Sequence, residues 1–316
     1  MVLDSDDKLL IKKECRKCLP AIRDIHKVKE SSWSRVYHIL TADQTFFCKA
    51  GPLSSAVTNE HRALSFLFAK GLRCVPEVIR YWEGRSSAFL VTRFIQGPGH
   101  YDAGRLGSNF AQVHSLKHQR DNCQDFTAGL ISGMENELSD LQYWWGKVNP
   151  KRVRLLNEAG SILNKMRSLY KKKKKFFIAQ RASFIHMDAQ DAVIPCGDEM
   201  YLVDWHMARY GDPACDLARL CAYERQQTTH FDQEYLMKAY CGGKELEESM
   251  AWRMCFYHAG SEAALLLYSF GDCANLVRYR ASPLVVGQRE EGFLGKLLDH
   301  KIEKSLHQIH SDLERL

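Results

Sequence analysis

The sequence predicts an α+β fold in two lobes, the first made of antiparallel strands with one helix and the second mainly helical. Short β-favouring runs fill most of the first hundred residues, whereas long helical patterns dominate the rest. The chain has 316 residues, and a single hydrophobic core stops growing near about 250. The stretch 96–99, Gln-Gly-Pro-Gly, separates the two patterns, because two glycines and a proline disfavour both regular structures. We therefore expect lobes at residues 1–97 and 98–316.

The elements of the first lobe follow from local pattern. Four short runs rich in β-branched and aromatic residues predict two pairs of strands, each pair joined by turn-forming residues: 36–39, 45–48, 77–82 and 87–94. A helix is expected between the pairs, because Asn59 can cap it and Glu60 suits its first turn. Leu64, Leu67 and Phe68 then fall on one face of this helix.

The second lobe is predicted to be helical apart from one β-rich island. Helical spacing covers four segments: 106–116, 133–147, 151–173 and most of 232–316. The island, 182–204, contains three short strand patterns, and Gly197 and Asp198 form the turn between the last two. An isolated hairpin in a helical lobe usually presents functional side chains, so the island is where we look for a site.

The composition indicates a cytoplasmic protein without a membrane span. No apolar run approaches the roughly 20 residues that a span needs. The first residues, MVLDSDDKLLIKKEC, carry acids where a secretory signal has basic and then apolar residues. The eleven cysteines are odd in number and scattered through a long chain, which favours reduced thiols over a disulfide framework.

The net charge of +6 comes from one region of the chain. Residues 119–180 hold twelve Lys and Arg against six Asp and Glu, with a focus at Lys171–Lys175. Such a run is usually a solvated helix end, so a nucleic-acid partner is not expected. Electrostatic binding of a nucleic acid or a membrane surface through Lys165, Arg167 and this run is the weakest alternative function.

Acidic side chains stand at the ends of the strands in the island. Asp188 follows the first strand pattern, Asp191 opens the second, and Asp204 ends the third. In a tight hairpin these carboxylates can converge at one end, and their repulsion is usually relieved by a divalent cation or a raised pKa. Any single Asp is more simply explained as a turn cap. Three at this spacing favour a metal site.

Three segments of the second lobe carry a resemblance to a known family. They are 184–188 (FIHMD), 201–205 (YLVDW) and 211–218 (GDPACDLA). Together they resemble the aminoglycoside phosphotransferase and choline kinase superfamily, whose signature is His-x-Asp-x4-Asn, a strand ending in Asp-Trp or Asp-Phe, and Gly-Asp-Pro-x-x-Asp-Leu-Ala. The resemblance covers about residues 25–220. It implies a protein-kinase-like bilobal fold, with a nucleotide-binding first lobe and a catalytic, substrate-binding second lobe.

The resemblance implies a role for each charged group of a kinase site. Lys49 would contact the α- and β-phosphates of ATP, and Glu60 would hold it in place. Asp204 would ligate Mg²⁺, and Asp188 would orient or deprotonate the attacking hydroxyl. His186 is more simply a packed, hydrogen-bonded loop histidine than a general base.

Further nucleotide contacts come from two other segments of the first lobe. The loop 30–35, which would cover the phosphates, has no glycine, so the hydroxyls of Ser32 and Ser34 could replace amide contacts there. Thr92 and Phe94 belong to the segment that resembles the strand and hinge holding adenine.

The island departs from the family signature at the metal-binding asparagine. Counting forward from Asp188 places Val193 in that slot, and a valine cannot bind a metal. Counting back from Asp204 places Asp191 there and conserves the hairpin, which we prefer because an Asp still offers oxygen to Mg²⁺. The loop before it is then two residues short. A pseudokinase that binds nucleotide or a partner without transfer is therefore the alternative function.

The acceptor is the least defined part of the site. Trp144 and Trp145 lie in a segment that helps build acceptor sites in the resembling family, and aromatic faces attract cationic amines, although a core role is favoured for tryptophans at this spacing. Tyr257 and Glu262 are further candidates to line the pocket. Residues 232–316 hold thirteen acids against ten bases, so an acidic pocket for polycationic antibiotics is not evident. We expect an ATP- and Mg²⁺-dependent kinase for a hydroxyl of a small molecule, such as an amino alcohol, an amino sugar or an antibiotic-like acceptor.

Overall fold

The computed structural model describes six stretches of the chain, which together form two compact units: 4–30, 34–97, 99–148, 150–189, 192–227 and 232–279. The first unit gathers the described residues of 1–116, 184–209 and 227–245, and the second those of 117–183, 210–226 and 246–316. The expected α+β class is confirmed. The division does not fall at residue 97 alone, because residues 184–209, which include most of the island, belong to the first unit. Asn109 shows why: its side chain donates to the carbonyl oxygen of Met200 at 2.7 Å.

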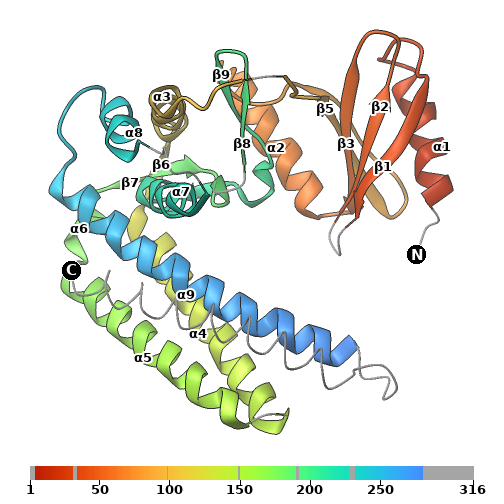
Figure 1. Ribbon diagram of the computed structural model, residues 1–316. Coiled ribbons are helices and arrows are strands. Elements are labelled where there is room, and N and C mark those ends of the chain that lie inside the picture. The colour runs from red at the N-terminus through yellow and green to blue at the C-terminus, as the bar shows by residue number, and fades with distance from the viewer. Residues whose placement is uncertain are drawn as a thin grey trace. The chain divides into compact units, whose positions relative to one another are not determined.

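The first unit contains a five-stranded antiparallel sheet with helices on it (Figure 1). Its elements up to residue 116 are α1 (Asp4–Cys15), β1 (Asp24–Glu30), β2 (Arg35–Leu40), β3 (Thr45–Pro52), α2 (Ala56–Ala69), β4 (Val78–Glu83), β5 (Ser87–Arg93) and α3 (Ala103–His114). The strand order is β1-β2-β3-β5-β4, which confirms the four expected strands. β1 was not expected. β1 buries only Ile25 of its seven residues, so it lacks the apolar alternation that reveals a strand.

The later segments of the first unit form the hairpin and a short helix. They are β8 (Val193–Cys196), β9 (Glu199–Leu202), the 3-10 turn η2 (Trp205–Met207) and α8 (Gln233–Tyr240). β8 pairs with β9 in an antiparallel hairpin, and Gly197 adopts a positive φ of 59° in its turn. The expected hairpin is therefore confirmed.

Alternation along β3 decides which side chains reach the core and which reach the site. Phe46, Cys48 and Ala50 are buried in one cluster with Ile11 and Cys15 of α1. Because successive side chains of a strand point to opposite faces, the side chain between Cys48 and Ala50 must leave on the other face of the sheet. That side chain belongs to Lys49, the cation expected to bind phosphate.

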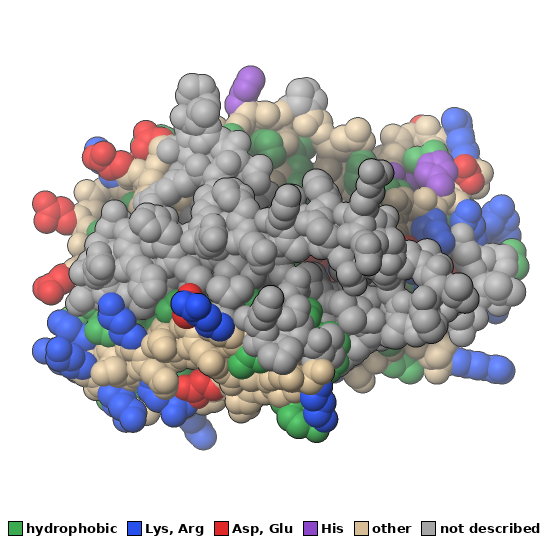
Figure 2. All heavy atoms as spheres, turned by 60° about the horizontal axis from the view of Figure 1, so that its bottom comes forward, with side chains coloured by type: hydrophobic (Ala, Val, Ile, Leu, Met, Phe, Trp, Pro, Cys, Tyr) green, Lys and Arg blue, Asp and Glu red, His purple; other side chains and the backbone are tan. Residues whose placement is uncertain are grey.

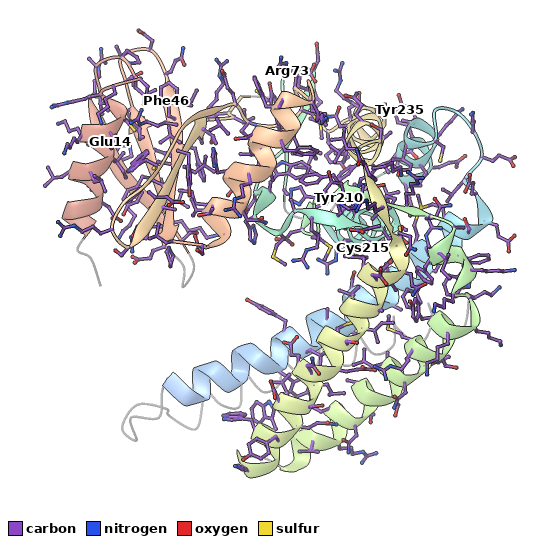
Figure 3. All side chains as sticks on the ribbon, turned by 180° about the vertical axis from the view of Figure 1, so that it is seen from behind. Glu14, Phe46, Arg73, Tyr210, Cys215 and Tyr235 are labelled. Carbon is purple, nitrogen blue, oxygen red and sulfur yellow. The ribbon has the colours of Figure 1, made fainter. Side chains whose placement is uncertain are left out.

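An ion pair adds to the packing of α1 on the sheet. Glu14, labelled with Phe46 in Figure 3, accepts a bond of 2.7 Å from Arg80 of β4. The N-terminal helix is thus tied to the sheet by polar as well as apolar contacts.

The start of α2 corrects one expectation. The helix begins at Ala56, and the Oγ of Ser55 caps it by accepting a bond of 3.2 Å from the amide of Val57. Asn59 is therefore inside the helix and is not its cap. Serine caps as well as asparagine does, and the earlier start buries Val57 completely.

The second unit is built from long helices. Its elements are β6 (Lys117–Asn122), α4 (Cys123–Val148), α5 (Pro150–Lys172), α6 (Lys175–Ile178), α7 (Pro213–Gln227) and α9 (Glu248–Tyr279), with β7 (Arg181–Ile185) and β10 (Arg209–Gly211) where the chain passes between units. The strand order of the second sheet is β10-β7-β6. The helices expected at 133–147 and 151–173 are present, although α4 begins ten residues before the first pattern. Of the helical pattern expected over most of 232–316, residues 280–316 lie outside the described part. No described helix combines the length and apolar composition that a bilayer crossing requires.

The basic run lies at the surface of the second unit. Lys171 and Lys172 end α5, Lys174 and Lys175 lead into α6, and all four side chains are exposed. Figure 2 shows Lys and Arg side chains gathered along the lower edge of the face it presents. No described carboxylate forms an ion pair with this run, which agrees with a solvated helix end.

A buried ion pair joins α9 to the start of α7. Arg253 Nε lies 2.8 Å from Asp212 Oδ2, and the two side chains are 1% and 0% exposed. Asp212 also accepts a bond of 3.0 Å from the amide of Ala214, which caps the helix, and Arg253 donates to the carbonyl oxygen of Phe176 at 3.1 Å. Two fully buried charges persist only because each neutralises the other.

Replacing Arg253 by Met should lower the free energy of unfolding by about 3–5 kcal/mol, because Met keeps the bulk but leaves a buried carboxylate without its cation. Urea titration followed by circular dichroism measures this. Arg181→Met, at an exposed position of the same unit, is the matched control and should cost less than about 1 kcal/mol. If Arg253→Met lowered the free energy of unfolding no more than Arg181→Met does, the buried ion pair would not be what stabilises the unit.

Candidate active site

One ammonium group lies between two carboxylates in the first unit. Lys49 Nζ of β3 donates to Glu60 Oε2 of α2 at 2.6 Å and to Asp204 Oδ1 at 2.7 Å. Lys49 and Glu60 are buried, with side chains 9% and 7% exposed, whereas the Asp204 side chain is 47% exposed. The structure thus brings together three of the residues that the sequence singled out, from a strand, a helix and a loop.

The pKa values of this cluster follow from its contacts. Burial alone would lower the pKa of Lys49, but the charges of Glu60 and Asp204 outweigh it and hold the pKa above its ordinary value. Burial alone would raise the pKa of Asp204, but a hydrogen bond from His206 and the charge of Lys49 hold it well below its ordinary value. The lysine is therefore charged, and Asp204 is ionised, at neutral pH.

The loop that carries Asp204 has an unusual backbone. Asp204 adopts a left-handed conformation, with φ at 61°, directly before η2. Trp205 is fully buried and its Nε1 donates to the carbonyl oxygen of Leu202 at 2.8 Å. Strained backbone in a non-glycine residue persists where the surroundings determine it, as at functional sites. Here the buried tryptophan anchors the turn that aims Asp204 at Lys49.

His206 is a site residue that the sequence analysis missed. Its Nδ1 bonds Asp204 Oδ1 at 2.7 Å, and this bond raises the pKa of His206. The only signal for it in the sequence is its place two residues after Asp204 in the Asp-Trp motif. Periodicity and composition cannot show that a ring will turn back onto its neighbour.

Asp188 is positioned by His186. The His186 side chain is fully buried, its Nδ1 accepts a bond of 3.2 Å from the amide of Asp188, and its Nε2 lies 2.7 Å from the carbonyl oxygen of Val203. Since Nδ1 accepts, Nε2 must carry the proton and donate. One neutral ring therefore ties the backbone of Asp188 to the residue before Asp204. The expectation of a packed, hydrogen-bonded histidine is confirmed.

The hairpin register bears on the metal-binding slot. Val193 is in β8 and pairs with Leu202, and the amide of Val203 donates to the carbonyl oxygen of Ala192 at 2.8 Å. Val193 is thus a strand residue, as the count back from Asp204 requires. Asp191 itself lies outside the described residues, so its role as a metal ligand stays a prediction.

The other expected nucleotide-binding residues lie around β2 and β5. Ser34 directly precedes β2 and is half-buried, while Ser32 lies outside the described residues. Thr92 is buried in β5, where it pairs with Phe47 of β3. Phe94 follows β5 and its ring centroid lies 4.6 Å from that of His38.

The expected acceptor residues all belong to the second unit. Trp145 is 2% exposed and packs edge-on against Trp144, with ring centroids 4.6 Å apart. Tyr257 is 1% exposed and its hydroxyl lies 2.6 Å from Thr127 Oγ1. These contacts place Trp145 and Tyr257 in the core of the unit. For Trp145 this is the core role that its spacing favours, and a part for Trp145 or Tyr257 in binding the acceptor stays a prediction. The side chain of Glu262, on α9, is outside the described part.

The described carboxylates suit a hard cation shared with a nucleotide. No described group of three or more His, Cys, Asp or Glu side chains gathers into a metal cluster. Mg²⁺, however, is usually held by one or two carboxylates together with phosphate oxygens. Within the described stretches, Asp204 Oδ2 and the Asp188 carboxylate accept no bond from protein. These oxygens are therefore not taken up by the described protein groups and suit such an ion chemically.

Replacing His186 by Ala should lower the free energy of unfolding by about 2–4 kcal/mol, because two hydrogen bonds and a buried ring are lost. Urea titration of the whole chain measures the change. His26→Ala, at a half-exposed position of β1, is the control and should cost less than about 1 kcal/mol. Equal costs for the two variants would show that the His186 bridge contributes nothing.

Known proteins resemble this chain in sequence and in fold. Residues 25–252, well over half of the chain, match the model of the phosphotransferase enzyme family. A search of curated proteins finds no match. Among solved structures, 243 chains match.

Three of the solved structures illustrate the likeness. Spectinomycin phosphotransferase in complex with ADP and spectinomycin has a TM-score of 0.64 at 11% identity, with 98% of each chain covered. Aminoglycoside phosphotransferase APH(4)-Ia has a TM-score of 0.60 at 14% identity, with 96% of this chain and 98% of that chain covered. A choline/ethanolamine kinase family protein from Mesorhizobium loti has a TM-score of 0.55 at 17% identity, covering 95% and 99%. The expected protein-kinase-like fold is thereby confirmed, and the chain belongs to the phosphotransferase enzyme family.

Proposed function

We propose that this enzyme transfers the γ-phosphoryl group of ATP, with Mg²⁺, to a hydroxyl group of a small molecule. The observation that carries the proposal is the Lys49 ammonium, buried between Glu60 and Asp204 with bonds of 2.6 and 2.7 Å. Phosphoryl transfer depends on positioning and charge neutralisation, so a fixed cation beside an ionised carboxylate is the arrangement it needs.

Lys49 and Glu60 would hold the nucleotide. The ammonium has three donors, and the two carboxylates take only two of them in the described structure. The third donor is left for a phosphate oxygen. Glu60 keeps the ammonium in place, because a buried carboxylate this close restricts its movement. Ser32, Ser34, Thr92 and Phe94 stay as predicted contacts of the phosphates and of adenine.

Asp188 would act on the acceptor. Its carboxylate would accept a hydrogen bond from the attacking hydroxyl and take up its proton as the phosphoryl group moves. The backbone at Asp188 is held by His186, and Met187 between them adopts a left-handed conformation with φ at 71°. This restraint supports a fixed position for the base.

Asp204 and Asp191 would hold the metal ion. When bound, Mg²⁺ neutralises the charge of the phosphates during transfer. Asp204 suits this task because its pKa is lowered and one of its oxygens accepts no bond from the described residues.

The acceptor class rests on the family and on the neighbours in fold. One neighbour was solved with ADP and spectinomycin, another with ADP and hygromycin B, and a third belongs to the choline/ethanolamine kinase family. We propose an amino alcohol, an amino sugar or an antibiotic-like molecule. The ten described cysteines are all free, which suits the reducing cytoplasm as the place of action.

Asp188→Asn should reduce the rate of phosphoryl transfer about 100- to 10,000-fold, because the amide keeps the shape but cannot accept the proton. The measurement is ADP release with Mg²⁺, ATP or GTP, and a panel of amino alcohols, amino sugars and aminocyclitol antibiotics. Asp198→Asn, at the exposed turn of the same hairpin, should leave the rate unchanged. Nucleotide binding without transfer to any acceptor would support a pseudokinase.

Lys49→Met should weaken binding of Mg·ATP about 10- to 100-fold, because a charge-assisted bond to phosphate is lost. Isothermal calorimetry measures the dissociation constant. Lys29→Met, at an exposed position of β1, is the matched control and should bind like the unsubstituted chain. Unchanged binding by Lys49→Met would show that Lys49 does not contribute to nucleotide binding.

A further inference from the structure

α2 and the Asp204 loop must keep a fixed separation if Glu60 and Asp204 are to share one ammonium. Glu60 is carried by α2, whereas Asp204 is carried by a loop 144 residues later in the chain. On its other side α2 is seated on β4, where the ring of His61 stacks on Tyr81 with centroids 4.0 Å apart. That contact places α2 on the sheet but does not involve the loop.

Asn59 connects the helix to the loop directly. Its Nδ2 donates to the carbonyl oxygen of His206 at 2.5 Å and is 3.3 Å from that of Ala208. Both partners are carbonyl oxygens, which only accept, so the orientation of the amide is determined. Asn59 directly precedes Glu60, and its two acceptors are His206, inside η2 (Trp205–Met207), and Ala208, directly after it.

The bonds around this connection form a closed circuit. Asn59 holds the backbone of His206, the His206 ring bonds Asp204, and Asp204 bonds Lys49. Lys49 bonds Glu60, which is the neighbour of Asn59 on α2. Every member of the circuit thus limits the movement of the others.

We propose that Asn59 is a positioning residue, which sets the distance between α2 and the Asp204 loop so that both carboxylates meet Lys49. It would act through the placement of Glu60 and Asp204, and not through a contact of its own with nucleotide or acceptor. The inference rests on the proposed function, since Lys49 is taken to hold phosphate. Asn59 thus positions the Asp204 loop and does not cap the helix, the role that its place in the sequence had suggested.

The test uses the full chain and an acceptor-independent measurement, the dissociation constant of Mg·ATP by calorimetry. Asn59→Ala should weaken binding about tenfold, because two hydrogen bonds are lost. Asn59→Asp should weaken it about 100-fold, because its carboxylate has the same shape but faces two carbonyl oxygens. Ser65→Asp, which adds the same charge at an exposed position of α2, should bind like the unsubstituted chain.

A double-mutant cycle separates positioning from a general loss of stability. In a Glu60→Ala background, Asn59→Ala should change the dissociation constant clearly less than tenfold, because one of the two carboxylate contacts that it positions is gone. A full tenfold effect in that background would overturn the inference, as would unchanged binding by Asn59→Ala in the presence of Glu60. If Asn59→Asp does not fold, as judged by circular dichroism, Asn59→Ala alone decides.

The two failures can be told apart. Absence of Mg·ATP binding by the unsubstituted chain overturns the proposed function and this inference with it. Normal binding by the unsubstituted chain, together with additive effects of Asn59→Ala and Glu60→Ala, overturns this inference alone.

Discussion

The buried ammonium of Lys49 is the constraint on which the first unit depends. A charge with a side chain only 9% exposed must be paired, and two carboxylates from separate elements pair it. The alternation of β3 turns Lys49 away from the apolar core, α2 carries Glu60, and Asp204 reaches the ammonium from a left-handed backbone conformation. Sheet, helix and loop are therefore positioned by a single electrostatic requirement.

Side chains that bond backbone groups support this centre. The loops that carry Asp188 and Asp204 are too short for regular hydrogen bonding, so other groups must satisfy their backbone. His186 bonds both the amide of Asp188 and the carbonyl oxygen of Val203, and Trp205 bonds the carbonyl oxygen of Leu202. Asn59, on α2, likewise bonds the backbone of the Asp204 loop, at the carbonyl oxygen of His206. Within the described residues, the loops of the site are thus held in part by side chains and not by secondary structure alone.

The two units contain ion pairs of different character. Arg253 and Asp212 are both essentially inaccessible, and their ion pair joins α9 to the start of α7. Lys49 and Asp204 differ in exposure, 9% against 47%, so one partner can still meet a molecule from solvent. This difference in exposure separates the pair that serves stability from the pair proposed to serve phosphate and metal.

The sequence by itself determined the strand pairs, the hairpin and the acids at its ends, because alternation, turn residues and motif spacing are local properties. The roles expected of Lys49 and Glu60 came from the family resemblance, because both residues stand in the order along the chain that the family's motifs have. Only the tertiary structure placed the island in the first unit and moved Asn59 from helix cap to loop contact. Contacts such as that of His206 with Asp204 arise from how a loop turns back on itself, and burial of Tyr257 from packing between helices. Neither leaves a periodic trace, because both depend on groups brought together by the fold.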